Sequence, residues 1–161
     1  MTANTHEYYL KKAIALAVDS VQRGGGPFGA VIVRDGKVVA EAWNQVTAQH
    51  DASAHAEVAA IRKAGAALGR HHLDDCVLYA SCEPCPMCLA TALWAHIPRI
   101  YFAAPHSEAA RVGFADTHIA EQLYGQARPV ALTEGLVSQL KVPDASMPFE
   151  AWLARVDRVE Y

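Results

Sequence analysis

Two short segments of the chain combine the residue types from which a hydrolytic metal site can be built. His55 and Glu57 enclose a single alanine, and a Pro-Cys-Pro-Met-Cys segment begins after 26 further residues and contributes Cys85 and Cys88. A catalytic zinc ion takes three protein ligands and keeps its fourth position for water. We therefore predict that the histidine and the two cysteines bind zinc, and that Glu57 acts beside the fourth position.

The helices that we expect around these residues favour the same site. Cys85 and Cys88 stand at positions i and i+3 in the first turn of a helix, so one metal ion can lie between their sulfurs. Pro86 suits that turn, because its missing N–H costs nothing there. His55 would open a second helix, and the positive ends of both helices favour thiolate over thiol and hydroxide over water.

Charge and proton transfer indicate an enzyme. Zinc with two thiolates and a neutral imidazole is formally neutral, so a bound water can lose a proton without leaving a large buried charge. Zinc lowers the pKa of bound water from about 15.7 to roughly 7. Glu57 could take that proton and pass it to a ring nitrogen and towards a departing amine. The four residues together predict a hydrolytic zinc enzyme.

A non-catalytic zinc-binding module is the alternative from a different class. Such a site needs a fourth ligand, and Cys82, three residues before Cys85, is the candidate for it. That reading leaves the His-x-Glu segment without a role. Cys76 lies in an apolar run and is expected in the core. Iron in place of zinc stays open, because affinity alone does not settle the metal.

Size, charge and composition restrict the other classes of function. The 161 residues suffice for a single domain, residues 1–161, and 52% of them are hydrophobic and 19% charged. The pI of about 6.2 argues against nucleic acid as a partner, because domains that bind it tend to be basic. The start of the chain is polar, and no apolar run approaches the ~20 residues of a membrane helix. We therefore expect a cytoplasmic protein with no membrane partner. In a reducing compartment, four cysteines within thirteen residues indicate metal binding or reactive chemistry rather than disulfides.

Hydrophobic periodicity alternates between helices and strands along the chain. We expect helices at 4–22, 54–68 and 86–95, and strands at 28–33, 38–43, 76–80 and 99–103, the first two strands joined by an Asp-Gly turn. Residues 44–53 suit a polar loop. Beyond residue 104 we expect a last strand at 129–132, a short helix at 134–140 and an amphipathic helix from Pro148 to Val159. Such alternation implies an α/β fold, with helices packed on the faces of a sheet.

Several stretches resemble one known family of enzymes. They are residues 25–33, 47–51, 54–58, 81–88 and 113–116, together with the closing Glu-Tyr pair. The His-x-Glu and Pro-Cys-x-x-Cys signature is typical of zinc-dependent nucleobase deaminases. From about residue 5 to residue 116 the chain resembles the cytidine deaminase superfamily, and within it most of all the bacterial guanine deaminases.

This resemblance implies the fold, the assembly and the reaction. The family fold has three layers, α/β/α, around a central mixed sheet of about five strands. The resemblance also implies a homodimer and the zinc-dependent hydrolysis of guanine to xanthine and ammonia. A small-molecule nucleobase is therefore the expected partner.

Four residues are assigned to the substrate by the resemblance. Phe28 would stack on the flat base, with an ordinary core aromatic as the alternative. Asn44 has an amide that both donates and accepts, which suits a purine edge, with a turn-forming asparagine as the alternative. Ala56 would be a further contact. Tyr161 would close the pocket at the end of a tail of about residues 142–161, which in this family is sometimes swapped between subunits.

The resemblance also implies that Asp116 is a second catalytic carboxylate. It would help a proton to reach the leaving amine, and the alternative is a helix N-cap, a role that aspartate often fills. Outside this site, Trp94 is expected in the core and His96 on the surface. The competing substrates are another nucleobase, a nucleoside, an aminated triazine or adenosine in tRNA. The tRNA branch predicts a basic face, whereas this chain has a net charge of -3.

Overall fold

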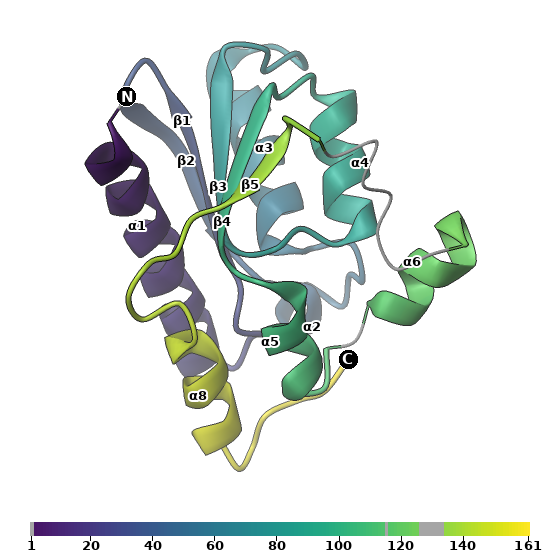
Figure 1. The fold of residues 1–161 in the computed structure, drawn as a ribbon. Coiled ribbons are helices and arrows are strands. Elements are labelled where there is room, and N and C mark those ends of the chain that lie inside the picture. The colour runs from purple at the N-terminus through teal and green to yellow at the C-terminus, as the bar shows by residue number, and fades with distance from the viewer. Residues whose placement is uncertain (1, 115, 126–133) are drawn as a thin grey trace.

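A mixed sheet forms the centre of the fold. The computed structural model describes residues 2–114, 116–125 and 134–161. The strands are β1 (Gly29–Arg34), β2 (Lys37–Trp43), β3 (Cys76–Cys82), β4 (Arg99–Ala104) and β5 (Val137–Gln139), and the sheet has the order β2-β1-β3-β4-β5 (Figure 1). The helices are α1 (Ala3–Gln22), α2 (Val46–Gln49), α3 (Ala56–Leu68), α4 (Pro86–Trp94), α5 (His106–Arg111), α6 (Thr117–Tyr124) and α8 (Met147–Ala154). The predicted α/β class and five-stranded mixed sheet are confirmed.

The first two strands form the expected hairpin. Asp35 and Gly36 turn the chain with φ angles of 49° and 71°. Positive φ at both central residues is the geometry of a tight hairpin turn, which an Asp-Gly pair adopts readily. β1 then lies between β2 and β3, antiparallel to both, and almost all of its side chains are buried. A strand in the interior of a sheet is apolar on both faces, which explains its unbroken hydrophobic run.

Parallel pairing begins at β3 and brings the ends of two strands to one edge of the sheet. β3 and β4 are parallel, with Cys82 opposite Ala104. The connection between them passes through α4, as a parallel crossover requires. Residues that follow the carboxyl ends of β3 and β4 therefore lie near each other.

The segment 134–140 is a turn followed by β5, so the helix predicted there was wrong. β5 pairs in parallel with β4, and the pairing extends beyond its ends through bonds from the Ile100 N–H to the Leu136 carbonyl and from the Leu140 N–H to the Phe102 carbonyl. The backbone groups at the open edge of β4 outweigh the local helical pattern of this short segment. The strand predicted at 129–132 lies outside the described residues.

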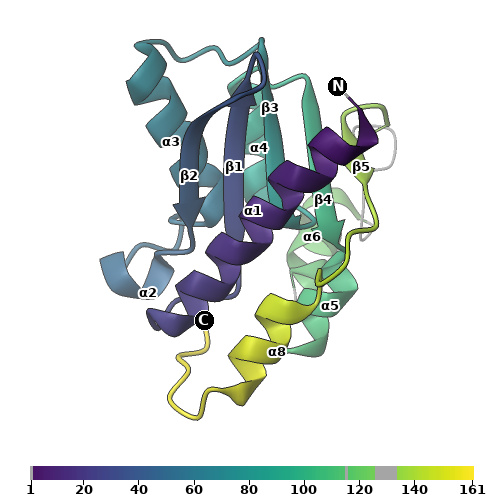
Figure 2. The same cartoon turned by 90° about the vertical axis from the view of Figure 1, so that its left-hand side faces the viewer.

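Helices cover both faces of the sheet. Figure 2 shows α1 and α8 in front of the sheet, with α3 and α4 behind it. On the α3 and α4 side, Ile32, Leu78 and Ile100 pack in one buried cluster. On the α1 side, Leu10 and Ile14 pack against alternate residues of β1 and β3. These are the three layers that the family resemblance implies.

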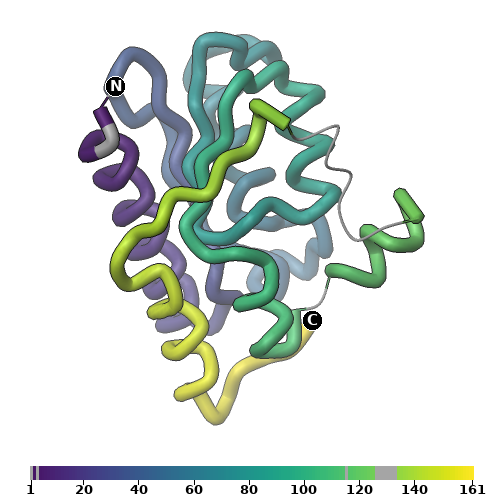
Figure 3. The backbone as a smooth tube through the Cα atoms, viewed as in Figure 1, coloured from purple at the N-terminus to yellow at the C-terminus, as the bar shows by residue number. Residues whose placement is uncertain are grey.

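The C-terminal tail is helical only over its first part. α8 ends at Ala154, so the helix predicted up to Val159 is too long. Val156 is 99% exposed, and the predicted apolar face of the helix does not extend to it. From Arg155 the chain runs without regular structure past the end of α1 to the C-terminus, a path that is plain in Figure 3. The Arg155 guanidinium donates to the carbonyls of Val21 and Gln22, which holds the tail against α1.

Three short helices and one side chain differ from the prediction. α2 lies within the expected polar loop, and α5 and α6 follow β4, where no element was predicted. Trp94, expected in the core, is 84% exposed at the end of α4, whereas His96 is exposed as predicted. In the described part of the chain, none of the helices has the length and apolar character needed to cross a membrane.

Candidate active site

Two helix N-termini meet beside the end of β3. His55 is the N-cap of α3 and Cys85 is the N-cap of α4, and neither helix start carries a side-chain cap. Pro86 occupies the first turn of α4, as the sequence indicates. Because the backbone N–H groups of both first turns point towards one region, their partial positive charge favours anions there.

His55, Cys85 and Cys88 are close enough to hold one metal ion. The His55 Nδ1 atom lies 3.5 Å from the Sγ atom of each cysteine. A tetrahedral zinc ion with Zn–S of ~2.3 Å and Zn–N of ~2.0 Å would hold a nitrogen and a sulfur ~3.5 Å apart. Across the described ranges, these three side chains form the one group whose ligand atoms all lie within 4.8 Å of one another. A set of two sulfurs and one nitrogen fits zinc and leaves one position open.

The two other cysteines are separate from this group. Cys82 is buried, its thiol donates weakly to the Pro105 carbonyl at 3.9 Å, and burial raises the pKa of the thiol. Cys76 is buried in the core beside α3 and α4, and burial raises its pKa to about 11. The arrangement of the sulfurs therefore does not support a non-catalytic zinc module with Cys82 as its fourth ligand.

Electrostatics distinguish the groups around the metal position. A hydrogen bond from the Cys88 thiol, together with His55, lowers the pKa of Cys85 to about 4 despite burial. Burial alone would lower the pKa of His55, but its hydrogen bond to Cys85 and the nearby negative charge raise it. The lowered pKa of Cys85 favours its thiolate, which is the form that binds a metal.

Glu57 is a buried carboxyl group next to the ligands. It lies in the first turn of α3, is 6% exposed, and its Oε2 atom accepts from the Cys88 thiol at 3.4 Å. Burial, followed by the charge of Cys85, raises its pKa to about 7. A buried carboxyl group beside an open metal position is placed to exchange protons with whatever binds there.

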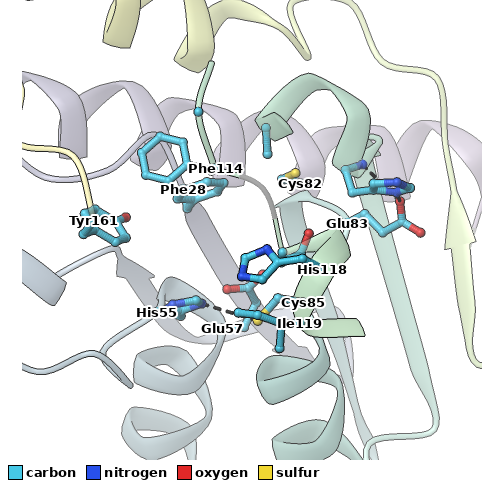
Figure 4. Close-up of a pocket in the computed structure, with 14 residues that line it drawn as sticks. Phe28, His55, Glu57, Cys82, Glu83, Cys85, Phe114, His118, Ile119 and Tyr161 are labelled. Atoms are coloured by element: carbon cyan, nitrogen blue, oxygen red, sulfur yellow. Dashed lines mark hydrogen bonds and ion pairs between the residues drawn. The ribbon is translucent and has the colours of Figure 1, made fainter. Parts of the chain in front are cut away.

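These groups open onto a cavity of about 450 Å³ (Figure 4). Its lining consists of Phe28, His55, Glu57, Cys82, Glu83, Cys85, His106, Ala109, Gly113, Phe114, Asp116, His118, Ile119 and Tyr161. Figure 4 shows His55 and Tyr161 on one side of the cavity and Glu83 on the other. Most of the predicted site residues thus come together in one pocket of the size that small ligands occupy.

Aromatic rings form one wall of this cavity. Phe28 and Phe114 meet edge to face with ring centroids 5.1 Å apart, and Tyr161 lies 5.1 Å from Phe114. Burial raises the pKa of the Tyr161 hydroxyl. Phe28 also lies 6.0 Å from Phe149 of α8. Flat apolar surfaces of this kind suit a flat heterocycle.

Asp116 contributes a second carboxylate to the cavity. It is half-buried, and burial, followed by the charge of Cys85, raises its pKa. It occupies the N-cap position of α6, but only its backbone carbonyl serves the helix, by accepting from the Ala120 N–H. The side chain makes no capping bond, so helix capping does not account for its carboxylate.

Asn44 and Ala56 are buried and do not line the cavity. The Asn44 Oδ1 atom accepts from the Val46 N–H at 3.2 Å, while its Nδ2 atom has no hydrogen-bond partner among the described residues. A buried amide donor without a partner costs free energy, so an acceptor supplied by a ligand would be favourable. Their roles towards the substrate stay predictions.

Sequence reasoning assigned no role in the site to seven residues that line the cavity, namely Glu83, His106, Ala109, Gly113, Phe114, His118 and Ile119. Glu83 directly precedes the cysteine motif, a signal that was present but unused. His106, Ala109, His118 and Ile119 lie on α5 and α6, where the sequence pattern predicted no element. Short helices of six and eight residues carry too few periodic positions to be detected.

Comparison with known proteins is consistent with this geometry. The family model of the cytidine and deoxycytidylate deaminase zinc-binding region matches residues 3–104. The chain belongs to this deaminase family. The resemblance inferred from the His-x-Glu and Pro-Cys-x-x-Cys segments is therefore confirmed, and so is the fold that it implies.

Individual relatives in the deaminase family are similar to the chain over different lengths. It is 46% identical to the guanine deaminase of Bacillus subtilis over 157 residues, which covers 97% of this chain and 99% of the relative. The solved structure of that protein covers 100% of this chain and 99% of its own, with a TM-score of 0.73. The guanine deaminase structure from Nitrosomonas europaea is 25% identical, with a TM-score of 0.79, over 92% of this chain and 85% of that one. The tRNA-specific adenosine deaminase of Agrobacterium fabrum is 40% identical over 104 residues, 65% of this chain and 67% of the relative.

Proposed function

We propose that this deaminase hydrolyses guanine to xanthine and ammonia. One observation carries the proposal: two carboxyl groups, Glu57 and Asp116, line the same cavity as His55 and Cys85 of the zinc-ligand group and a wall of aromatic rings. The near full-length similarity to the Bacillus subtilis guanine deaminase supports guanine among the possible amines. In the reaction, a water oxygen bonds to the ring carbon that bears the amino group, and the bond from that carbon to the amine breaks.

Zinc held by His55, Cys85 and Cys88 would supply a Lewis acid beside which water ionises near neutral pH. Glu57 would accept the proton of the attacking water and hand it to a ring nitrogen. Its burial favours this work, because a dry carboxyl group accepts a proton more readily than an exposed one. The carboxyl group is next to the ligand group, since it lies 3.4 Å from the Cys88 sulfur.

Asp116 would deliver a proton to the leaving amine. Ammonia leaves far more readily than amide ion, so the C–N bond needs a proton donor near it. Burial and nearby negative charge raise the Asp116 pKa, which favours a carboxyl group that can carry that proton. Phe28 and Phe114 would hold the plane of the base, and Asn44 would direct its unpartnered Nδ2 donor to a base acceptor.

The tail of about residues 142–161 would close the site. Tyr161 lines the cavity beside Phe114, and the segment before it is held by Arg155 at the end of α1. A ring in this position limits the entry of bulk water and of ligands much larger than a base. We also propose that residues 1–161 form a single domain and that this tail is part of it.

Deamination of adenosine in tRNA is the second candidate. The similarity to tRNA-specific adenosine deaminases supports it over about two thirds of the chain. Two observations favour the free base: the net charge of -3, and Tyr161 at the cavity, where an anticodon loop would need space. Polyanionic partners gain most of their affinity from basic surfaces, which this charge does not provide.

We also propose a cytoplasmic homodimer. Leu93 and Trp94 at the end of α4 are 46% and 84% exposed, and a second copy of the chain would cover them. Exchange of the tails between subunits is one form that such a dimer could take. Light scattering should give twice the 17.4 kDa of one chain, and Trp94→Lys should shift the mass towards the monomer. A monomeric wild type would contradict the proposal.

A substrate panel tests the function directly. Ammonia release should be measured for guanine, adenine, cytosine, guanosine, cytidine, melamine and a tRNA anticodon stem-loop, with zinc content determined on the same sample. We expect guanine to have the highest kcat/KM. A clear preference for another compound would overturn the substrate, and no release from a zinc-loaded sample would overturn the enzymatic function.

A further inference from the structure

Glu83 connects the segment that carries the metal ligands with α5, the helix that precedes Asp116. It follows β3 directly, and its own N–H donates to the Ala104 carbonyl at the end of β4. Two residues later comes Cys85, so the backbone of Glu83 is part of the segment that carries the metal ligands. Its side chain is only 10% exposed, and it points away from its own segment towards α5.

The Glu83 carboxylate anchors the first residue of α5. Its Oε2 atom accepts from the backbone N–H of His106 at 3.0 Å and from the Nδ1 atom of the same residue at 2.8 Å. Hydrogen bonds to a charged acceptor are shorter and stronger than neutral ones. A helix of six residues has little stability of its own, so its position depends on such anchors.

α5 in turn determines where the Asp116 segment begins. The N–H groups of Gly113 and Phe114 donate back to the carbonyls of Ala110 and Ala109 at 3.1 and 2.9 Å. The helix and the turn after it are therefore one hydrogen-bonded unit, and Asp116 follows two residues later. A displacement of the start of α5 would move this unit and the carboxylate that it presents to the cavity.

We propose that Glu83 is a positioning residue that holds the Asp116 carboxylate in place through His106 and α5. The inference rests on the proposed role of Asp116 in guanine deamination. The glutamate that directly precedes the cysteine motif thereby has a role. Its carboxylate couples the segment that carries the metal ligands to Asp116, the second proton donor. Misplacing a catalytic group by about 1 Å can cost roughly 100-fold in rate.

The alternative roles of Glu83 make different predictions. Because it lines the cavity, Glu83 could contact the substrate directly, and its loss would then mainly raise KM. A general stabilising role would lower the melting temperature and leave kcat of the folded enzyme unchanged. A positioning role lowers kcat and does so only while Asp116 is present.

The test is a double-mutant cycle between Glu83→Ala and Asp116→Ala, measured on zinc-loaded protein with the best substrate of the wild type. We expect each single variant to lose roughly 10- to 100-fold in kcat, with KM within about twofold and full zinc content. The double variant should be no more than about twofold slower than Asp116→Ala alone, because the two residues act as one unit. Glu83→Gln keeps an oxygen acceptor for both His106 donors and should recover most of the rate.

Two further variants complete the experiment. Glu108→Ala is the matched control, since it removes another carboxylate of α5 that pairs with Arg111 on the outer surface and should leave kcat unchanged. If Glu83→Ala does not fold, His106→Ala replaces it, because this variant removes the Nδ1 donor and keeps the backbone bond. Its loss in kcat should be smaller and should also vanish in the Asp116→Ala background.

Distinct outcomes overturn distinct claims. Additive losses in the double variant, or a change in KM alone, would overturn the positioning role while leaving the proposed function intact. A normal kcat for Asp116→Ala would overturn the role of Asp116 together with this inference. Failure of guanine as the substrate would show already in the wild-type panel and would not affect the cycle.

Discussion

The Tyr161 hydroxyl lies in the space that any side chain at Gly26 would need. A Cβ atom built on Gly26 would overlap that hydroxyl, although the backbone there permits other residues. Gly26 follows α1 and Tyr161 is the last residue, so segments from both ends of the chain meet beside the cavity that Tyr161 lines. The position of Tyr161 is therefore sensitive to a substitution at Gly26, which does not itself line the cavity.

Gly26→Ala should therefore displace Tyr161 and weaken catalysis without loss of zinc. We expect kcat/KM to fall roughly tenfold, or ~1.4 kcal/mol, because the aromatic wall beside Phe114 is lost. Deletion of Tyr161 should have the same effect, and Gly26→Ala should add nothing to it. Steady-state kinetics of the three variants test this. If Gly26→Ala lowered kcat/KM by a further tenfold in the variant that lacks Tyr161, its effect would not pass through Tyr161.

Gly65→Ala provides the matched control for this substitution. Gly65 lies within α3, away from the cavity, and an added Cβ would lie 3.1 Å from the Arg70 carbonyl. A small backbone adjustment accommodates that contact, and alanine favours the helix. We expect unchanged kcat/KM, so a loss here would indicate that glycine replacements act through general stability.

Glu57→Gln should keep the metal and lose turnover. The amide has nearly the shape of the carboxyl group and cannot accept and return a proton, so we expect kcat to fall roughly 10²- to 10⁴-fold. Kinetics and elemental analysis of the same sample test this prediction. A variant with near-normal kcat would remove Glu57 from its proposed role, and one without zinc would point to a role in metal binding.

The metal ligands can be tested by removing sulfurs one at a time. Cys88→Ser should lose most of its zinc and all measurable activity, because two remaining ligands hold the ion weakly. Cys76→Ser and Cys82→Ala should retain zinc, since neither thiol belongs to the ligand group. Elemental analysis should measure zinc and iron together, with chelation and zinc restoration as the functional check. Loss of zinc in Cys82→Ala would restore the four-ligand alternative.

The sequence indicates the cysteine pair clearly because the geometry of that pair is local. Cys85 and Cys88 share one helical turn, and the proline that begins α4 marks that turn in the sequence. The Asp-Gly turn of the hairpin is local in the same sense. Glu57 is found from its neighbour His55, which lies two residues away. Each of these inferences needs only a few consecutive residues.

The features that the sequence did not predict depend on contacts between segments that are distant in the chain. Residues 134–140 carry a helical pattern but contain a turn followed by β5, because the edge of β4 offers them hydrogen-bond partners. Trp94 has the composition of a core residue and lies on the surface, since helical spacing does not tell which face of α4 is covered. The link from Glu83 to His106 joins residues 23 positions apart, and no periodicity reports it.

An ion cluster far from the active site predicts how stability depends on pH. Partial burial acts to raise the pKa of Asp75, but hydrogen bonds from Arg70, Cys76 and Arg34 outweigh it, so the pKa lies below its ordinary value. A carboxyl group with a lowered folded-state pKa stabilises the fold above its ordinary pKa of about 4, and this stability is lost as the pH falls through the folded value.

Asp75→Asn should therefore lower the melting temperature by an amount that stays constant from neutral pH down to about pH 5 and diminishes as the pH falls further. Thermal unfolding should be followed in the presence of a chelator, so that acid-induced loss of metal does not contribute. Asp35→Asn is the matched control, because this aspartate lies 3.8 Å from Arg34, its side chain is 83% exposed and solvent screens the pair. We expect little effect of Asp35→Asn at any pH. A gap between wild type and Asp75→Asn that does not diminish at low pH would show that lost packing, rather than lost charge, causes the destabilisation.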